Sequence, residues 1–432
     1  MTLEGQSRRL RSWKQIARYL DRNVRTVMRW EKTYGMPVHR IPGENKGRSV
    51  FALTGELDAW IMERDLPEDD SGAPSGFPQA GDPRAIAALV VILLAVAGAT
   101  IVVSGRIDDE GIAVIPRLEA TNGHIVAKGA SDEVAWDFEQ PEGRDFTPNM
   151  QVQQTLRLPN GDELVLFSSN TRDGQLGLAD RGELFAFSPA GELRWRMIRE
   201  DSYRFAAQTF SPPWVSRSLM VHDVGGQPTI AWTVHHYTWW PSTLFILNEE
   251  GGLEGRFVNS GWLNRTAVSK SPDGDRLLAG GISNSRSGAM LAVLDAKAID
   301  GSSPEEPGSE FECQNCPGGN PLRYLVFPRS HVNIASGLPY NETVDIQATG
   351  AGISVSVREG LAGSDIAWVY DFSTEFELRH VTPSDSYWPA HQMLELEGKI
   401  DHPAESCLQR LPPPVRSWTP EGGWTDVVPS TG

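Results

Sequence analysis

Residues 182–195 are Gly-Glu-Leu-Phe-Ala-Phe-Ser-Pro-Ala-Gly-Glu-Leu-Arg-Trp, an apolar run followed by a turn. Before them, residues 162–170 form a similar run, Asp-Glu-Leu-Val-Leu-Phe-Ser-Ser-Asn. The same order of turn, apolar run, loop and second run recurs at 275–284 and 288–295, and residues 242–248 form a half copy. Short apolar runs bounded by Gly, Asn and Asp are typical of β-strands joined by hairpins. The repetition therefore predicts a large all-β domain made of similar sheets.

Two acidic turns precede the repeated runs. Asn160-Gly-Asp162 and Asp273-Gly-Asp275 have the composition of tight hairpin turns. Both segments also resemble the start of a Ca²⁺-binding loop, but the carboxylate spacing that such a loop needs is incomplete. Hairpin turns are therefore the favoured interpretation.

The sequence pattern of residues 184–195, a strand followed by a turn and a second strand, resembles that of quinoprotein-like and WD40-like β-propellers. The resemblance implies a propeller-like domain over residues 111–432. A fold of this kind serves many functions, so the resemblance alone implies no activity.

Residues 85–104, Ala-Ile-Ala-Ala-Leu-Val-Val-Ile-Leu-Leu-Ala-Val-Ala-Gly-Ala-Thr-Ile-Val-Val-Ser, carry no charge. At about 1.5 Å per residue, a helix of this length spans roughly 30 Å, the hydrocarbon thickness of a bilayer. The sequence predicts one transmembrane helix at 84–104; a buried core helix and a cleaved signal peptide are the alternatives. Residues 66–83, rich in Pro, Gly, Ser and Asp, are expected to form a flexible linker.

The charge of the chain is divided unequally. Residues 1–64 contain 13 Lys and Arg against seven Asp and Glu, a net charge of +6. Because the whole chain has a net charge of −17, the remainder carries −23. A basic end on an acidic chain indicates an anionic partner for that end only.

The basic end has the pattern of a small helical domain, residues 1–65. Ser12 and Gln15 form a capping box at the start of one helix. A second helix is expected at 24–32 with Val27 facing inward, and a third begins at Thr54. Between the last two helices, residues 36–51 have hairpin composition.

These residues resemble the winged helix-turn-helix of the MerR and excisionase superfamily. The matching segments are Trp13-Lys-Gln-Ile-Ala17, Val24-Arg-Thr-Val-Met-Arg-Trp30-Glu31, Pro37-Val-His-Arg40, Phe51-Ala52 and Leu57-Asp-Ala-Trp60. The resemblance implies that the second helix enters the major groove of DNA while the hairpin touches the backbone. The DNA-binding residues it implies are Arg22, Arg25, Thr26, Arg29, Arg40, Lys46 and Arg48. The long dimerisation helix of full-length MerR regulators is not visible in the sequence.

The fold class expected from these patterns is multi-domain: a small all-α winged helix-turn-helix domain, one transmembrane helix and a large all-β, propeller-like domain. The expected function is a membrane-tethered one-component transcription regulator, a homodimer that binds double-stranded DNA in the cytoplasm. Its C-terminal domain, periplasmic or extracellular, would sense an unknown ligand or protein. For the basic residues, the alternative is a solvated arginine face of the helix. For the whole protein, the alternative is an adhesion or scaffold protein whose helix-turn-helix binds a cytoplasmic protein.

The C-terminal part contains few residues with chemical signatures. Cys313 and Cys316 have redox-motif spacing but lie among Pro, Gly and Asn, which favours a disulfide over catalysis or zinc. One thiol, that of Cys407, is then left outside the disulfide. Residues 235–241, His-His-Tyr-Thr-Trp-Trp-Pro, suit either strand packing or an exposed stacking surface. No G-x-S-x-G, H-E-x-x-H or P-loop spacing occurs. The sequence thus favours a protein without enzymatic activity, metal or cofactor.

Overall fold

The computed structural model describes residues 116–429, except 148–149, 173–179, 207, 237–239 and 409–413. In the N-terminal part it describes residues 9–10, 16, 27, 31, 36–40, 50–53 and 57. The chain divides into two compact units, unit 1 (Met1–Ile107) and unit 2 (Asp108–Gly432).

Unit 1 contains a three-stranded antiparallel sheet of order β1-β3-β2. Its strands are β1 (Arg9–Leu10), β2 (His39–Arg40) and β3 (Val50–Leu53). The pairing of His39 with Phe51 confirms the hairpin predicted for residues 36–51. A small apolar core lies around the sheet and includes helical positions: Leu10, Ile16, Val27, Met36, Val50, Ala52 and Leu57.

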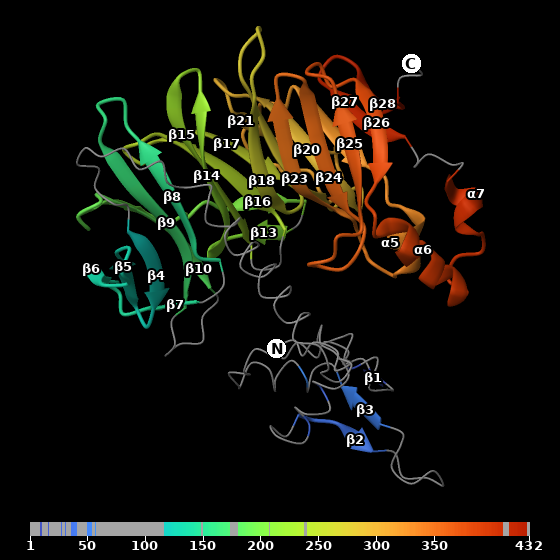
Figure 1. Ribbon diagram of the computed structural model, residues 1–432, viewed down its shortest axis with the longest axis horizontal. Helices are drawn as coiled ribbons and strands as arrows, with labels where there is room; N and C mark the ends of the chain where they lie inside the picture. Colours follow the sequence, from blue (N-terminus) through green and yellow to red (C-terminus); the bar gives the residue numbers. More distant parts are fainter. Residues whose placement is uncertain are drawn as a thin grey trace, which may run out of the picture. The chain divides into compact units, whose positions relative to one another are not determined.

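Unit 2 consists of consecutive, mainly antiparallel sheets (Figure 1). The first sheet contains β4 (Arg117–Thr121), β5 (His124–Lys128) and β6 (Val134–Glu139). The second sheet contains β7 (Asp145–Phe146), β8 (Val152–Arg157), β9 (Glu163–Arg172), β10 (Arg181–Phe187) and β11 (Leu193–Met197). A two-stranded ribbon follows, β12 (Tyr203–Phe205) and β13 (Gln208–Phe210).

Three further sheets complete unit 2. The third sheet contains β14 (Trp214–Val224), β15 (Gln227–His236), β16 (Ser242–Leu247), β17 (Leu253–Asn259) and β21 (Asp300–Ser302). The fourth contains β18 (Leu263–Ser269), β19 (Arg276–Ser283), β20 (Gly288–Asp295), β22 (Arg323–Phe327), β27 (Val415–Thr419) and β28 (Gly423–Val427). The fifth contains β23 (Glu342–Thr349), β24 (Gly352–Arg358), β25 (Ala367–Phe372) and β26 (Leu378–Pro383).

Three short helices lie beside the fifth sheet in Figure 1. They are α5 (His331–Ala335), α6 (Tyr387–Leu396) and α7 (Ala404–Leu408). Ser330 caps α5 by accepting a hydrogen bond from the backbone of Asn333. Tyr387 and Leu394 of α6 are buried in the core shared with the fourth and fifth sheets.

Neighbouring sheets share apolar cores because successive side chains of a strand point to opposite faces. In β15, Ile230 and Trp232 enter the core shared with the second sheet, whereas Ala231 enters the core shared with the fourth. Sheets covered on both faces need nearly continuous apolar strands. This requirement explains the long apolar runs of the sequence repeat, which form the hairpins β9–β10 and β19–β20.

The turns expected at the start of these hairpins are confirmed. Gly161 donates a backbone hydrogen bond to Leu158, and Gly274 donates one to Ser271. Gly161 has φ 88° and Gly274 has φ 124°, conformations that residues with a Cβ rarely adopt.

The expected fold class is wrong for this structure. Unit 1 is not all-α, since it contains the β1-β3-β2 sheet. The sheets of unit 2 are separate, and among the described residues no pairing joins the first sheet to the last to close a propeller ring. The local pattern of strand and turn is the same in closed rings and in open series of sheets, so the repeat could not distinguish them.

The membrane expectation also needs correction. Within the part of the chain that the structure describes, no helix is both long and apolar enough to cross a membrane. The predicted span, residues 84–104, and the linker at 66–83 lie outside the described residues. The descriptions of the chain as a helix-turn-helix, single-pass, β-propeller protein therefore do not fit this predominantly β structure.

Candidate anion-binding site

The first strands of the third, fourth and fifth sheets lie next to one another, and each is interrupted by a bulge. The pairing register shifts around Arg217 in β14, Asn264 in β18 and Val344 in β23. A bulge redirects side chains out of the regular alternation and is common next to functional sites. Arg265 joins two of the bulges, since its Nε donates to Val344 O at 2.7 Å and its Nη1 to Asn264 O at 2.9 Å.

Four charged residues gather at the bulges, and we call them the arginine cluster: Arg217, Arg265, Arg358 and Glu342. Glu342 is only 7% exposed and accepts hydrogen bonds from Arg358 and from the amide of Asn264. Glu342 thus pairs with Arg358, and the charges of Glu342, Arg265 and Arg358 all act on Arg217. The cluster is a positive region within a part of the chain that is strongly acidic as a whole.

Arg217 is the member of the cluster for which the described residues supply no oxygen acceptor, whereas Arg265 donates to two carbonyl oxygens and Arg358 to Glu342. The guanidinium of Arg217 lies 4.1 Å from the centroid of the Trp262 ring, and Nη1 donates weakly to Met150 Sδ at 3.5 Å. Its buried Nε has no hydrogen-bond partner among the described residues. Burial lowers the pKa of Arg217 to about 10; Glu342 opposes this effect, whereas Arg265 and Arg358 add to it. Arg217 is therefore still charged at neutral pH.

Backbone geometry holds Trp262 in place beneath Arg217. Ile282 donates a backbone hydrogen bond to Trp262 O at 2.7 Å. A Cβ on Gly281 would lie 1.8 Å from the same carbonyl oxygen, so only glycine fits there. The close approach of β19 thus fixes the aromatic surface on which the guanidinium rests.

The adjacent histidines of β15 are packed in opposite directions, as the period of a strand requires. His235 stacks on Trp262 with 5.8 Å between ring centroids, while His236 packs edge-on against Phe210 at 5.2 Å. Burial lowers the pKa of His235 to about 4, and the charge of Arg217 lowers it further. Both rings are less than 8% exposed, which supports strand packing over an exposed stacking surface.

The arrangement suits a small anion. A guanidinium presents its donors in a planar fork that matches carboxylate and phosphate groups. Because Arg217 is partly removed from water, such a pair would be stronger there than on an open surface. Trp262 supplies an apolar face for the rest of the ligand, and neutral His235 contributes no charge of its own beside Arg217.

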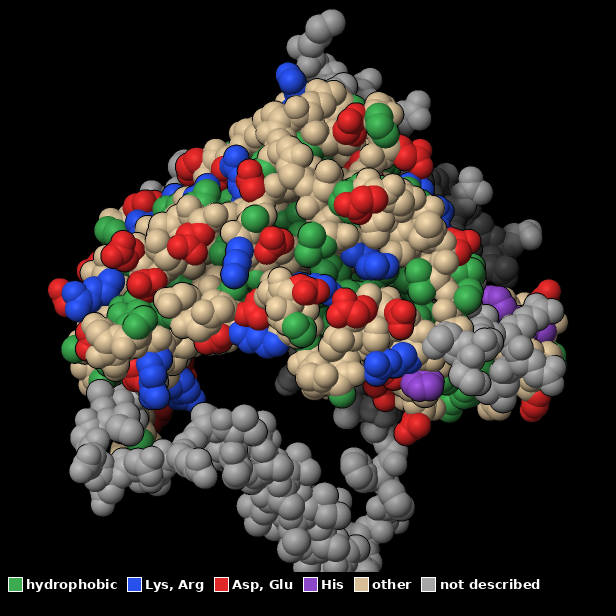
Figure 2. Space-filling model, turned by 90° about the horizontal axis from the view of Figure 1, so that it is seen from above, with side chains coloured by type: hydrophobic (Ala, Val, Ile, Leu, Met, Phe, Trp, Pro, Cys, Tyr) green, Lys and Arg blue, Asp and Glu red, His purple; other side chains and the backbone are tan. Residues whose placement is uncertain are grey.

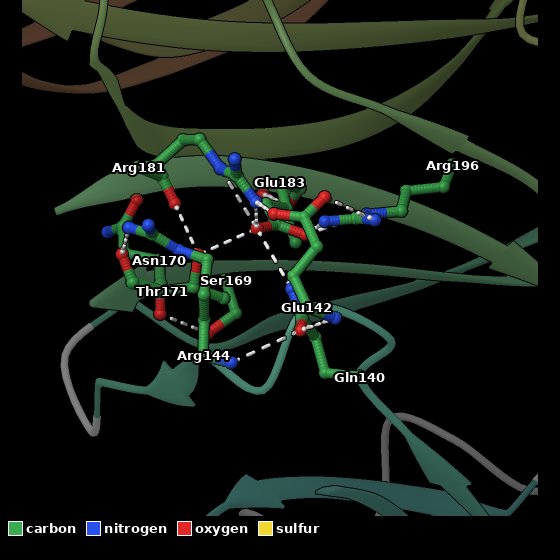
Figure 3. Close-up of polar contacts among 10 residues, drawn as sticks. Gln140, Glu142, Arg144, Ser169, Asn170, Thr171, Arg181, Glu183 and Arg196 are labelled. Carbon is green, nitrogen blue, oxygen red and sulfur yellow. Dashed lines mark hydrogen bonds and ion pairs between the residues drawn. The ribbon is translucent and has the colours of Figure 1, made fainter. Parts of the chain in front are cut away.

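A second arginine-containing network lies in the second sheet and differs from the cluster in being compensated (Figure 3). The side chain of Glu183 is fully buried and pairs with Arg181 at 2.7 Å and with Arg196 at 2.7 Å. Both arginines also contact Glu142, at 2.6 Å and 3.2 Å. Burial alone would raise the pKa of Glu142, but the hydrogen bond and charge of Arg181 and those of Arg196 lower it overall. Arg181 and Arg196 balance the two carboxylates, and a third guanidinium, that of Arg144, joins the network through Thr171. Because each carboxylate is paired with two cations, we assign this network a structural role.

Most of the predicted DNA-binding residues lie outside the described residues. They are Arg22, Arg25, Thr26, Arg29, Lys46 and Arg48. The backbone of Arg40 ends β2, and its side chain is not described. Val27 is helical and fully buried, as predicted for an inward-facing position.

Cys313 and Cys316 are joined in a disulfide. The loop between them is fixed to the ribbon before it, since Asn315 Oδ1 accepts from the backbone of Arg204 at 2.7 Å and Nδ2 donates to Ser202 O at 3.0 Å. The half-cystines pack against the core between the second and third sheets. The disulfide therefore anchors a loop.

Residues with metal-ligating atoms also converge in the structure. His331, His391, His402 and Cys407 place their ligand atoms within 4.8 Å of one another at the three helices. The sequence analysis missed this group, although His391-x10-His402-x4-Cys407 was visible as a signal, because His331 is 60 residues away from the nearest of them. It also missed the arginine cluster, whose members come from four strands.

Comparisons with known proteins leave the family open. No family model and no curated protein matches the chain. A solved protein of unknown function from Bacteroides caccae is 10% identical, with a TM-score of 0.24, covering 62% of this chain and 93% of that one. A eukaryotic initiation factor is 6% identical (TM-score 0.27; 62% and 62%), and a glycosyl hydrolase from Bacteroides ovatus is 12% identical (TM-score 0.26; 62% and 86%). TM-scores this low support no conclusion about fold or function.

Proposed function

We propose that the protein is a transcription regulator in which unit 1 binds double-stranded DNA and unit 2 binds a small anionic ligand. The observation that carries the proposal is the opposite charge of two separate units. Residues 1–64 have a net charge of +6, unit 1 as a whole (Met1–Ile107) has +3, and unit 2 has −20. Cationic surfaces bind nucleic acid by neutralising phosphates and releasing counterions, whereas a strongly acidic unit is repelled by DNA.

The surface of unit 2 supports this assignment of roles. On the face shown in Figure 2, basic and acidic side chains are interspersed without a continuous patch of Lys and Arg. Positive charge gathers in unit 2 at the arginine cluster. There, Arg217 lacks an oxygen acceptor among the described residues. A few partly buried cations fit a carboxylate or phosphate of a small molecule better than the extended backbone of a duplex.

DNA binding is tested with the full-length chain and duplex DNA in a gel shift. We expect binding that weakens steeply between about 50 and 200 mM salt. Arg25→Ala with Arg29→Ala should weaken binding at least tenfold. The matched control is Arg194→Ala with Arg379→Ala, which removes the same charge from exposed positions of unit 2 and should leave binding unchanged. Salt-independent binding, or an equal loss of binding in both double variants, would overturn the proposal. A pulldown in which the full-length chain captures a cytoplasmic protein and no DNA would overturn it as well.

Ligand binding is tested by calorimetry with the full-length chain and a panel of mono- and dicarboxylates and phosphate esters. We expect at least one class to bind the wild type and not Arg217→Met, which keeps the apolar contact with Trp262 but removes the charge. Arg379→Met is the matched control. Equal binding of every ligand to the wild type and to Arg217→Met, or no binding to either protein, would show that Arg217 binds no anion.

A further inference from the structure

Four side chains with metal-ligating atoms meet where the three short helices come together (Figure 1). His331 begins α5, His391 lies in α6, His402 lies between α6 and α7, and Cys407 lies in α7. His331 Nδ1 lies 3.1 Å from His402 Nε2 and 3.5 Å from Cys407 Sγ, and His391 Nε2 lies 3.4 Å from His402 Nε2. These are atoms of types that transition metals bind.

The spacing matches the edges of a coordination tetrahedron. A zinc ion with Zn–N distances of about 2.0 Å and a Zn–S distance of about 2.3 Å separates neighbouring ligand atoms by about 3.3 to 3.6 Å. Three separations in the group, 3.1, 3.4 and 3.5 Å, lie in or near this range. All four ligand atoms lie within 4.8 Å of one another, close enough for one ion to draw them together.

A carboxylate orients one of the rings. His402 Nδ1 lies 3.0 Å from Asp401 Oδ1. A carboxylate oxygen accepts a hydrogen bond, so Nδ1 donates to it and Nε2 is left with its lone pair toward the group. A histidine held through its other nitrogen by a carboxylate is the common arrangement around bound metals.

Hydrogen bonds among the imidazoles do not satisfy the group. The single lone pair of His402 Nε2 faces both His331 Nδ1 and His391 Nε2, and it can accept from only one of them. His391 is fully buried, and its Nδ1 has no hydrogen-bond partner among the described residues. A metal ion bound at Nε2 of His391 would remove the competition of this nitrogen for the His402 lone pair.

We propose that His331, His391, His402 and Cys407 bind one zinc ion in a closed, four-coordinate structural site. Four protein ligands leave no position for water or substrate, which is the mark of a structural site. Imidazole with one thiolate suits zinc, a borderline-soft ion, better than Mg²⁺ or Ca²⁺, which prefer oxygen. The site joins the segment after β22 to the segment before β27, two strands that pair in the fourth sheet. This inference does not depend on the proposed function.

The test uses the full-length protein, loaded with zinc, dialysed, and measured by atomic emission. We expect about one zinc ion per chain, lost on His331→Ala, an exposed position whose change leaves the core intact. Asp401→Asn keeps all four ligands and should weaken zinc binding about tenfold to a hundredfold. The matched control, His380→Ala, removes an exposed histidine of β26 and should bind like the wild type.

Cobalt substitution identifies the ligands. The Co²⁺ protein should show a thiolate-to-cobalt charge-transfer band and the intense visible bands of four-coordinate Co²⁺, and Cys407→Ser should remove the charge-transfer band. Chelation should lower the unfolding temperature of the wild type and leave that of His331→Ala unchanged. The proposal is overturned if the wild type binds no zinc, if it retains copper or iron in preference, or if His331→Ala and Asp401→Asn bind zinc as tightly as the wild type does.

Discussion

Two arginine-containing groups of unit 2 share their composition and differ in their balance of charge. Around Glu183, two guanidinium groups meet two carboxylates, and every charge has an opposite neighbour within 3.2 Å. The arginine cluster has three guanidinium groups and one carboxylate, Glu342, which pairs with Arg358. Arg217 rests on Trp262 without a carboxylate in contact among the described residues. A balanced group stabilises the fold, whereas an unbalanced one is available to bind something else. Variants in each group test this distinction.

The largest effect is expected from Glu183→Ala. It leaves Arg181 and Arg196 facing a buried space without their main counter-charge, and breaking a buried pair in this way costs about 3–5 kcal/mol. Urea unfolding at neutral pH measures the loss. Glu192→Ala, which removes an exposed partner of Arg194, is the control and should change stability by less than about 0.5 kcal/mol. Similar small losses for both variants would show that the network around Glu183 is not structural.

The next effect concerns pH and His235, beside the arginine cluster. Its pKa is about 4 in the folded protein against 6.5 as the ordinary value, so the unfolded chain binds the proton more readily. Stability from this residue is fully present above pH 6.5 and is lost as the pH falls toward 4. The loss is on the order of 3 kcal/mol. Urea unfolding at pH 7 and pH 4.5 should show this slope in the wild type and a smaller one in His235→Gln; identical slopes would contradict the neutral, buried state of the ring.

Arg217→Met is expected to behave in the opposite way to Glu183→Ala. Removing a cation that has no oxygen acceptor should leave the free energy of unfolding within about 1 kcal/mol of the wild type. Affinity for the anion should fall by about 1.5–3 kcal/mol, the value of a hydrogen bond to a charged group. Arg217→Lys should not restore it, since an ammonium lacks the planar fork. Calorimetry measures the anion affinity and urea unfolding measures the free energy of unfolding on the same samples. A large loss of stability with no loss of affinity would show that Arg217 has a structural role and does not bind the anion.

The smallest effect is expected from Glu142→Gln. The Glu142 side chain is 43% exposed, and solvent screens its pairs with Arg181 and Arg196. The expected loss is about 1 kcal/mol or less, measured by urea unfolding. A loss as large as that of Glu183→Ala would show that both carboxylates, and not the buried one alone, hold the network.

The sequence predicted the strands of unit 2 well because strands buried on both faces need nearly continuous apolar residues, and such runs are visible at 162–170 and 275–284. It predicted the Gly161 and Gly274 turns for a similar local reason. Whether the sheets close into a ring depends on long-range pairing, and that expectation was wrong. The arginine cluster depends on bulges at Arg217, Asn264 and Val344, which shift the register by one residue and have no sequence signature of their own. The predicted DNA contacts remain predictions.

A regulator with the proposed function requires the anion bound at Arg217 to change how tightly unit 1 holds DNA. The most direct measurement is the equilibrium DNA affinity of the full-length chain at fixed salt, with and without the anion selected by calorimetry, for the wild type and for Arg217→Met. The account predicts that the anion changes the affinity of the wild type by about fivefold or more and leaves that of Arg217→Met unchanged. Equal DNA affinity with and without the anion in the wild type, at a concentration that saturates its site, would contradict it.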